Sequence, residues 1–389
     1  MGRFSDHKAP ILAGTVASIT GTAASAGLVL TALTALNATT AQTASAIFVL
    51  IAMYGLLSIG LSWRYKMPIS IVWSTPGAAL LISSGKLHLP FSSAVGAFIV
   101  TGFLLLLTGL WPALGRLVSS IPKPIASAML AGVIFNFCIA PFQSAADFPW
   151  IVLPAILVWL VLYKYATIWA TPAAMVIIFT LTAIDRGISF GNSDLLPHVE
   201  LVAPTFDIAA IVSIGIPLYL VTMASQNIPG VAIMKSFGYE VPFKQVMTAT
   251  GSAAIIAGFF GGFSMNLAAI TAALNANEHA HKDPKRRWLS SVYGGYVYLI
   301  IALLAVPTVA FVLQAPKELV LAAAGLALLG TIVSALSAAV EVVDLRMPAM
   351  VAFLVAASGV SAFGIGSAFW ALIAGLVVWG WLSLRKRAN

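Results

Sequence analysis

The chain has 389 residues, of which 60% are hydrophobic and only 8% are charged, and its mean hydropathy is +1.01. This composition is too apolar for a soluble protein of that length, and the continuous apolar runs exclude a large β-barrel, whose strands would alternate. The formal net charge of +8 does not indicate nucleic-acid binding, because loops of membrane proteins carry basic residues that set orientation. A single cysteine, Cys138, excludes an internal disulfide and a cysteine-based metal site.

Hydropathy predicts an all-α polytopic membrane protein with about fourteen segments, since a spanning helix needs roughly 20 apolar residues. In chain order the predicted segments are 9–36, 42–63, 76–84, 90–115, 123–143, 147–165, 168–184, 207–228, 242–258, 264–276, 286–313, 317–338, 347–362 and 366–384. The third and tenth are too short to cross a hydrocarbon core of about 30 Å. They are predicted half-helices.

The polar connection over 185–205 divides the chain into a first repeat, 1–200, and a second repeat, 201–389. Each repeat holds seven segments, and because seven is odd the second must be inverted relative to the first. The half-helices are third in their repeats, and this arrangement places a binding site near the bilayer midplane. The sequence has no Walker-type Gly-rich loop, so transport would draw on a gradient.

The distribution of basic residues predicts the orientation. With a cytoplasmic N-terminus, the outer loops hold only Lys86, Arg186 and Lys317 of the 20 Lys and Arg residues. Cytoplasmic loops of membrane proteins carry the excess of Lys and Arg. Both termini are therefore predicted to be cytoplasmic.

The first candidate site is a break at the start of the third segment. Ser74 or Thr75 can cap a helix there, and Pro76 suits the first turn because proline lacks an N–H group. Free N–H groups would then belong to Gly77 and Ala78, whose small size lets a ligand approach the backbone. The alternative is a proline-kinked packing helix, because Pro and Gly are common in membrane helices.

A second break precedes the tenth segment. A glycine pair ending at Gly262 supplies unhindered backbone, Ser264 is the predicted N-cap, and Met265 and Asn266 begin the predicted half-helix. Phe263 would place an aromatic face beside the positive helix end. Two such ends at bilayer depth predict a transporter with an anionic substrate, here an aromatic carboxylate. A Gly-rich loop with a lipid-facing phenylalanine is the alternative.

Three adjacent polar residues, Ser225, Gln226 and Asn227, lie near the interior in the eighth segment. Uncharged polar groups there need partners in protein, ligand or water, and polar contacts between helices would explain any one of them equally well. Tyr219 is a further candidate for a contact with a substrate ring. Thr15 and Ser18 in the first segment are weaker candidates, because small-residue helix packing also explains them.

Titratable residues point to no catalytic or metal site. The five histidines fall in loops or tails, and the Glu278-His279-Ala280-His281 stretch is interpreted as a solvated loop. No carboxylate lies clearly within a span, whereas proton-coupled carriers usually use a buried titratable group. A coupled proton would therefore travel on the substrate's own carboxylate, on an edge acid such as Asp207, or through water. Neither a cofactor nor a metal is expected.

The chain resembles the benzoate:proton symporter (BenE) family. The matching stretches span the chain, and they are Trp73-Ser-Thr-Pro-Gly-Ala-Ala-Leu-Leu81, Val221-Thr-Met-Ala-Ser-Gln-Asn-Ile-Pro-Gly230, Leu267-Ala-Ala-Ile-Thr-Ala-Ala273, Leu326-Ala-Leu-Leu329 and Gly364-Ile-Gly-Ser-Ala-Phe-Trp370. This family is similar in architecture to nucleobase transporters and sulfate permeases. The resemblance implies a bacterial inner-membrane, multi-pass protein with seven-plus-seven inverted repeats.

It also implies a core domain from segments 1–4 and 8–11, a gate domain from segments 5–7 and 12–14, and an elevator-like displacement of the core. Related transporters often dimerise through the gate, so a homodimer is one expectation. In the nucleobase branch, acidic side chains on segments 8 and 10 hold the substrate. The corresponding neighbourhoods here carry Ser225-Gln226 and Phe263-Ser264, and this loss of negative charge suits an anion.

The sequence therefore predicts a secondary carrier that imports benzoate or a similar aromatic carboxylate together with a proton. The helix ends at 75–78 and 263–266 would bind the carboxylate, Phe263 and Tyr219 would contact the ring, and Ser225 and Gln226 would add hydrogen bonds. A carrier for another small organic anion or a nucleobase and a passive anion channel on the same fold are the alternatives. A membrane-embedded enzyme lacks a supporting residue set.

Overall fold

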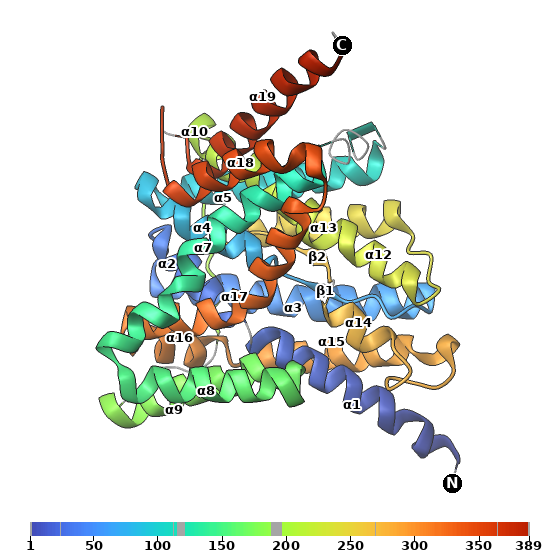
Figure 1. The fold of residues 1–389 in the computed structure, drawn as a ribbon. Coiled ribbons are helices and arrows are strands. Elements are labelled where there is room, and N and C mark those ends of the chain that lie inside the picture. Colours follow the sequence, from blue (N-terminus) through green and yellow to red (C-terminus); the bar gives the residue numbers. More distant parts are fainter. Residues whose placement is uncertain are drawn as a thin grey trace.

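The structure is a computed structural model, and it describes residues 2–23, 25–111, 113–114, 121–187, 197–268, 270–363 and 365–387. Figure 1 shows a bundle of helices with two very short strands near its centre. Apolar side chains dominate the interior of this bundle.

The first half begins with the consecutive helices α1 and α2, and continues through a half-helix. Its elements are α1 (Gly2–Ala23), α2 (Ala26–Ala35), α3 (Thr40–Tyr65), β1 (Ile71–Val72), α4 (Thr75–Ser84), a 3₁₀ turn (Gly85–Leu87), α5 (Phe91–Leu110), α7 (Lys123–Asp147), α8 (Pro149–Tyr165) and α9 (Thr167–Arg186).

The second half repeats this order with a more irregular first helix. Its elements are α10 (Ile208–Ala210), a π-helical turn (Ile211–Gly215), α11 (Ile216–Thr222), a second π-helical turn (Met223–Asn227), α12 (Ile228–Ser236), α13 (Phe243–Gly258), β2 (Asn266–Leu267), α14 (Ile270–Ala276), a 3₁₀ turn (Pro284–Arg286), α15 (Trp288–Ala302), α16 (Ala305–Gln314), α17 (Lys317–Val340), a 3₁₀ turn (Val343–Leu345), α18 (Arg346–Ser358) and α19 (Ser367–Arg387).

These elements account for all fourteen predicted segments as helices, broken helices or half-helices. Seven helical runs in the described part of the chain are long and apolar enough to cross a membrane, and a bent pair raises this to as many as eight. Two of the runs are composite, because α1 with α2 and α10 through α12 each form one span. The bent pair is α15 and α16, which meet at 59°.

The packing of the helices shows the inverted repeat. Helix α5, the fourth segment, packs along α13, the ninth segment. Helix α15, the eleventh segment, packs along α3, the second segment. Exchanging the two halves converts one pair into the other. The same exchange relates the α8–α9 pair to the α18–α19 pair. The fold is therefore an all-α membrane bundle of two seven-segment repeats.

Prolines explain the irregular helices that hydropathy did not predict. Each π-helical turn of the eighth segment lies just before a proline, Pro217 or Pro229. A proline removes one backbone hydrogen bond and its ring clashes with the carbonyl four residues earlier, so the helix locally widens. Pro307 lies three residues after the break that separates α15 from α16.

Glycines let neighbouring helices approach to backbone contact. A Cβ atom on Gly251 of α13 would stand 2.3 Å from the Leu106 nitrogen of α5. One on Gly325 of α17 would stand 2.2 Å from the Phe137 carbonyl oxygen of α7. Membrane helices use such small residues because lipid gives no hydrophobic drive for helix association.

Contacts between helix ends agree with the predicted alternation of sides. Lys66 lies over the Trp288 ring at 3.9 Å from its centroid, and Lys123 pairs with Glu341 at 3.5 Å. Each contact joins two helix ends that the Lys and Arg count places on the same, cytoplasmic side. The absolute orientation stays a prediction.

Candidate substrate site at the paired helix breaks

The two predicted breaks meet through a pair of short antiparallel strands. Ile71 of β1 pairs with Leu267 of β2, and Val72 pairs with Asn266. Figure 1 shows both strands in the middle of the bundle. The strand ladder brings segments almost 200 residues apart in sequence into contact, and it leads directly into α4 on one side.

The start of α4 has the predicted cap but fewer free donors than predicted. The Ser74 hydroxyl accepts a hydrogen bond from the Gly77 N–H at 2.9 Å, and the Ala78 N–H donates to the Ser74 carbonyl at 2.8 Å. The prediction that Gly77 and Ala78 offer free N–H groups is therefore wrong. Pro76 has no N–H, so the free donor of this end is the Thr75 N–H, which has no partner among the described residues.

Packing requires a glycine at position 77. A Cβ atom there would stand 2.7 Å from a methyl carbon of Leu218 in α11. The helix start is thereby held against the eighth segment. Pro76, Gly77 and Ala78 are buried, whereas Thr75 is half-buried.

The second break differs from its prediction in where the helix begins. Asn266 lies in β2, and α14 starts at Ile270, so Ser264 is not the N-cap and Met265 does not open a half-helix. Pairing with β1 holds this stretch as a strand in place of the helix start that the local capping pattern predicted. Gly261 adopts a φ of +83°, a left-handed conformation that glycine adopts without the Cβ clash.

Ser264 and Asn266 instead bind the first break directly. The Ser74 N–H donates to the Ser264 hydroxyl at 3.3 Å. The Asn266 amide satisfies its neighbours when its oxygen faces the same N–H at 3.1 Å and its nitrogen donates to the Met265 carbonyl at 3.0 Å. All these groups are buried. The two breaks are therefore joined by both backbone and side-chain hydrogen bonds.

Phe263 lies in the core of this unit. It is fully buried, and its ring lies 6.2 Å from that of Phe98 in α5. Gly262 and Met265 are buried beside it. The Phe263 ring packs against protein, and its contact with a substrate ring stays a prediction.

The eighth segment contributes one structural amide and two accessible polar groups. The Asn227 oxygen accepts from the Leu267 N–H of β2 at 3.0 Å, and its nitrogen contacts the Met223 sulfur at 3.6 Å. The Ser225 hydroxyl donates to the carbonyl of Val221 within its own helix. Ser225 and Gln226 are half-buried, whereas Asn227 is fully buried.

Two other predicted residues, Tyr219 and Ser18, form hydrogen bonds between helices. The Tyr219 hydroxyl hydrogen-bonds with that of Thr108 in α5, and the Tyr219 side chain is buried. Ser18 donates to the Gly294 carbonyl of α15 at 2.9 Å. This contact between helices matches the packing alternative given for Ser18 in the sequence analysis. Thr15 is half-buried on the same helix.

Sequence reasoning missed two buried residues beside these elements. Thr222 is fully buried, and its hydroxyl has no partner among the described residues. Trp73, which directly precedes the α4 cap, is buried and donates its indole N–H to Ser25 at 2.7 Å. Both lie in the stretches that carry the family resemblance, which was the signal available for finding them.

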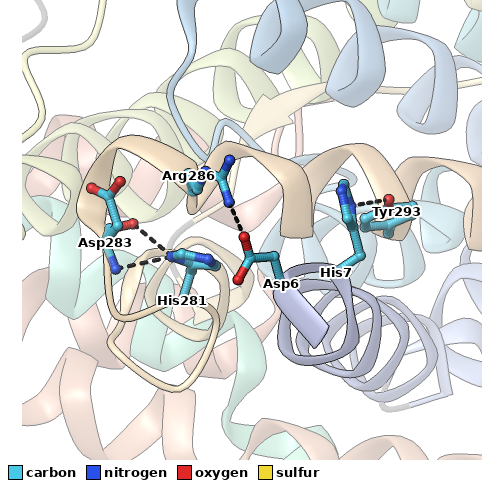
Figure 2. Close-up of polar contacts among 6 residues, drawn as sticks. All are labelled: Asp6, His7, His281, Asp283, Arg286 and Tyr293. Atoms are coloured by element: carbon cyan, nitrogen blue, oxygen red, sulfur yellow. Dashed lines mark hydrogen bonds and ion pairs between the residues drawn. The ribbon is translucent and has the colours of Figure 1, made fainter. Parts of the chain in front are cut away.

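The histidine-rich loop is held by contacts within the protein. Figure 2 shows Asp283 beside His281, whose Nδ1 accepts from the Asp283 backbone N–H at 2.9 Å, and Arg286 paired with Asp6. His7 on the same helix as Asp6 contacts Tyr293 at 2.7 Å. Among the described residues no group of three or more His, Cys, Asp or Glu side chains is placed to hold a metal ion.

The inverted repeat and the paired breaks at its centre define a membrane transport protein. The family model described as "Benzoate membrane transport protein" (BenE) matches residues 5–380. The chain belongs to this family, whose members are membrane transporters and not enzymes.

Known relatives cover most or all of the chain. The chain is 38% identical over 390 residues to "Inner membrane protein YdcO" of Escherichia coli (strain K12), with 100% of both chains covered. It is 31% identical over 337 residues to "Benzoate membrane transport protein" of Acinetobacter baylyi (strain ATCC 33305 / BD413 / ADP1), covering 85% of this chain and 84% of that protein. Among solved structures, the transmembrane domain of the cyanobacterial bicarbonate transporter BicA matches with a TM-score of 0.60 and 16% identity, covering 96% and 98% of the two chains.

Proposed function

We propose that the protein is a secondary carrier that imports benzoate or a similar aromatic carboxylate together with a proton. The observation that carries this proposal is the unpaired Thr75 N–H at the N-terminus of α4, in the centre of the bundle beside the paired breaks. A helix N-terminus favours anions, because its N–H groups point at the ligand and its dipole end is positive.

The chemistry around this helix end supports a carboxylate ligand. Thr75 of the third segment and Ser225 and Gln226 of the eighth are half-buried polar residues. The Ser225 hydroxyl donates to the Val221 carbonyl, and none of the predicted site residues carries a charge. A negative ligand therefore meets no repulsion there. Membership of the benzoate transporter family and the named function of the Acinetobacter relative make benzoate the first substrate to test.

Proton coupling would use the ligand carboxylate or a group at the membrane edge. Asp207 is the nearest acid along the eighth segment, and its carboxylate accepts from the Ala209 N–H at 2.9 Å as the cap of α10. In this proposal the carrier lies in the bacterial inner membrane with both termini in the cytoplasm. The E. coli relative is named an inner membrane protein.

The proposed movement is an elevator-type displacement of the core segments 1–4 and 8–11 against the gate segments 5–7 and 12–14. The hydrogen bonds that join the two breaks support it, because through them the N-terminus of α4 would move together with β2 and the eighth segment. A homodimer through the gate would give the core a fixed frame.

Uptake into proteoliposomes tests the proposal. An inward proton gradient should drive accumulation of radiolabelled benzoate, and a protonophore should abolish the accumulation. Uracil is the matched neutral-base control, and liposomes without protein set the background. Accumulation of uracil without benzoate, or benzoate flux that is indifferent to the gradient, would refute the proposed substrate or the proposed coupling respectively.

A further inference from the structure

A cavity of about 810 Å³ lies between the first repeat's α2 and α4 on one side and the long helices α7 and α17 on the other. Its rim carries Lys86 and His88, which follow α4, and Lys317, which begins α17. Lys86 and Lys317 are two of the three basic residues that the sequence places on the outer side. The cavity therefore opens at the predicted outer end of the boundary between core and gate segments.

The charge of this cavity has one sign. Lys86 and Lys317 are exposed, and none of the described lining residues is acidic. Neither lysine forms an ion pair with a described residue. Glu318, the neighbour of Lys317, is exposed but does not line the cavity. Uncompensated charges of one sign in a concave site concentrate ions of the other sign.

The cavity wall also offers apolar surface and amides. Phe137, Val133 and Leu321 line it together with Asn136 and Gln143 of α7. The Asn136 nitrogen donates to the Ala357 carbonyl at 3.1 Å, whereas Gln143 is exposed. A volume of this size accommodates a small aromatic molecule, and ligand sites typically combine apolar walls with a few polar groups.

The cavity lies at the opposite end of α4 from the proposed substrate site. Ile82 and Ser83 near the C-terminal end of α4 line it, while Thr75 begins the same helix. At 1.5 Å per helical residue, about 10 Å separates Ile82 from Thr75. A ligand in the cavity is thus one helix length from the N-terminus of α4.

We propose that this cavity is an outer vestibule in which Lys86 and Lys317 capture organic anions before they reach the N-terminus of α4. The identity of the anion as an aromatic carboxylate rests on the proposed function. The capture itself rests on the charge and lining of the cavity.

Cysteine labelling tests the charge of the vestibule without relying on transport. The only native cysteine, Cys138, is buried, so a Cys138→Ser background with Gln143→Cys places one thiol in the cavity. Ser83→Cys places a thiol at a second position of the cavity, so the measurement can still be made if one of the two reporter variants folds poorly. The anionic methanethiosulfonate ethylsulfonate and the cationic ethyltrimethylammonium analogue are compared by their labelling rates. Lys86→Gln with Lys317→Gln removes the capture charges, and Lys164→Gln is the control at an exposed lysine outside the cavity.

The ratio of anionic to cationic labelling should fall about fivefold in the double lysine variant in 0.15 M salt, and further at lower salt, because screening weakens with ionic strength. The Lys164→Gln ratio should match that of the background. Benzoate should slow labelling in the background more than in the double variant. An unchanged ratio in the double variant at both reporters overturns the vestibule, whereas a fall in the ratio without benzoate uptake by the native protein would overturn only the proposed substrate.

Discussion

Replacing Thr75 by proline removes one backbone N–H from the centre of the proposed site and leaves the rest of α4 in place. Thr75 is the first residue of α4, a position that proline favours because its fixed φ of about −65° is helical. Thr75 already precedes Pro76 in a helical conformation, so the change adds no new restriction to the following bond. The Ser74 cap to Gly77 is untouched.

The expected loss follows from the strength of a hydrogen bond to a charged group. Such a bond contributes about 1.5–3 kcal/mol, and each 1.4 kcal/mol is about a factor of ten in affinity. Thr75→Pro should therefore raise the KM for benzoate by about 10- to 150-fold. Thr75→Ala keeps the N–H and loses only the hydroxyl, so its KM should change by less than about fivefold.

The assay is initial-rate uptake in proteoliposomes over a range of benzoate concentrations. Thermal unfolding in detergent shows whether each variant is as stable as the native protein. If Thr75→Pro is folded and its KM equals that of Thr75→Ala, the N–H of Thr75 does not bind the substrate and the reasoning is refuted.

Three further predictions concern stability and pH. Asn227→Leu should lower the unfolding free energy by about 1–3 kcal/mol, because it leaves the buried N–H that this amide binds without an acceptor. Ser225→Ala should change the unfolding free energy by less than about 0.5 kcal/mol. Equal thermal shifts of the two variants would contradict this prediction. Gly325→Val should abolish the monodisperse peak in size-exclusion chromatography. Gly330→Val on the same helix should keep this peak, because a Cβ atom at position 330 would have no atom within 4 Å. A normal monodisperse peak for both variants would disprove the close helix contact. Burial raises the pKa of Tyr239 above its usual value of about 10, so the folded state holds this proton more tightly and stability should decline as pH rises above about 10. Melting curves of the native protein and Tyr239→Phe at pH 9 to 11 check this, and parallel declines would contradict it.

The sequence predicted the segments well because long apolar runs and helix breakers are local signals. A helix start is predicted by Ser74, Pro76 and Gly77 from their residue types alone, and the structure confirms the cap at Ser74. The odd number of segments per half also predicted the inverted repeat. The Lys and Arg count and the observed contacts between helix ends agree on which ends share a side.

The details of the second break were beyond local reasoning. Strands β1 and β2 have two residues each, too few for any alternation in hydropathy to register. Their pairing joins residues far apart in sequence, and it determines that Asn266 lies in a strand and that Ser264 accepts from the Ser74 N–H. The same non-local contacts bury Phe263 against Phe98, which side-chain type alone did not indicate.

Equilibrium binding to the purified native protein tests the central claim most directly, namely that the N-terminus of α4 holds a carboxylate. Benzoate and benzamide have the same ring and nearly the same shape, and they differ in charge. Isothermal titration should give saturable binding of benzoate and at least tenfold weaker binding of benzamide, since the positive helix end favours the anion. Equal affinities for the two compounds, or binding of benzamide alone, would contradict the account.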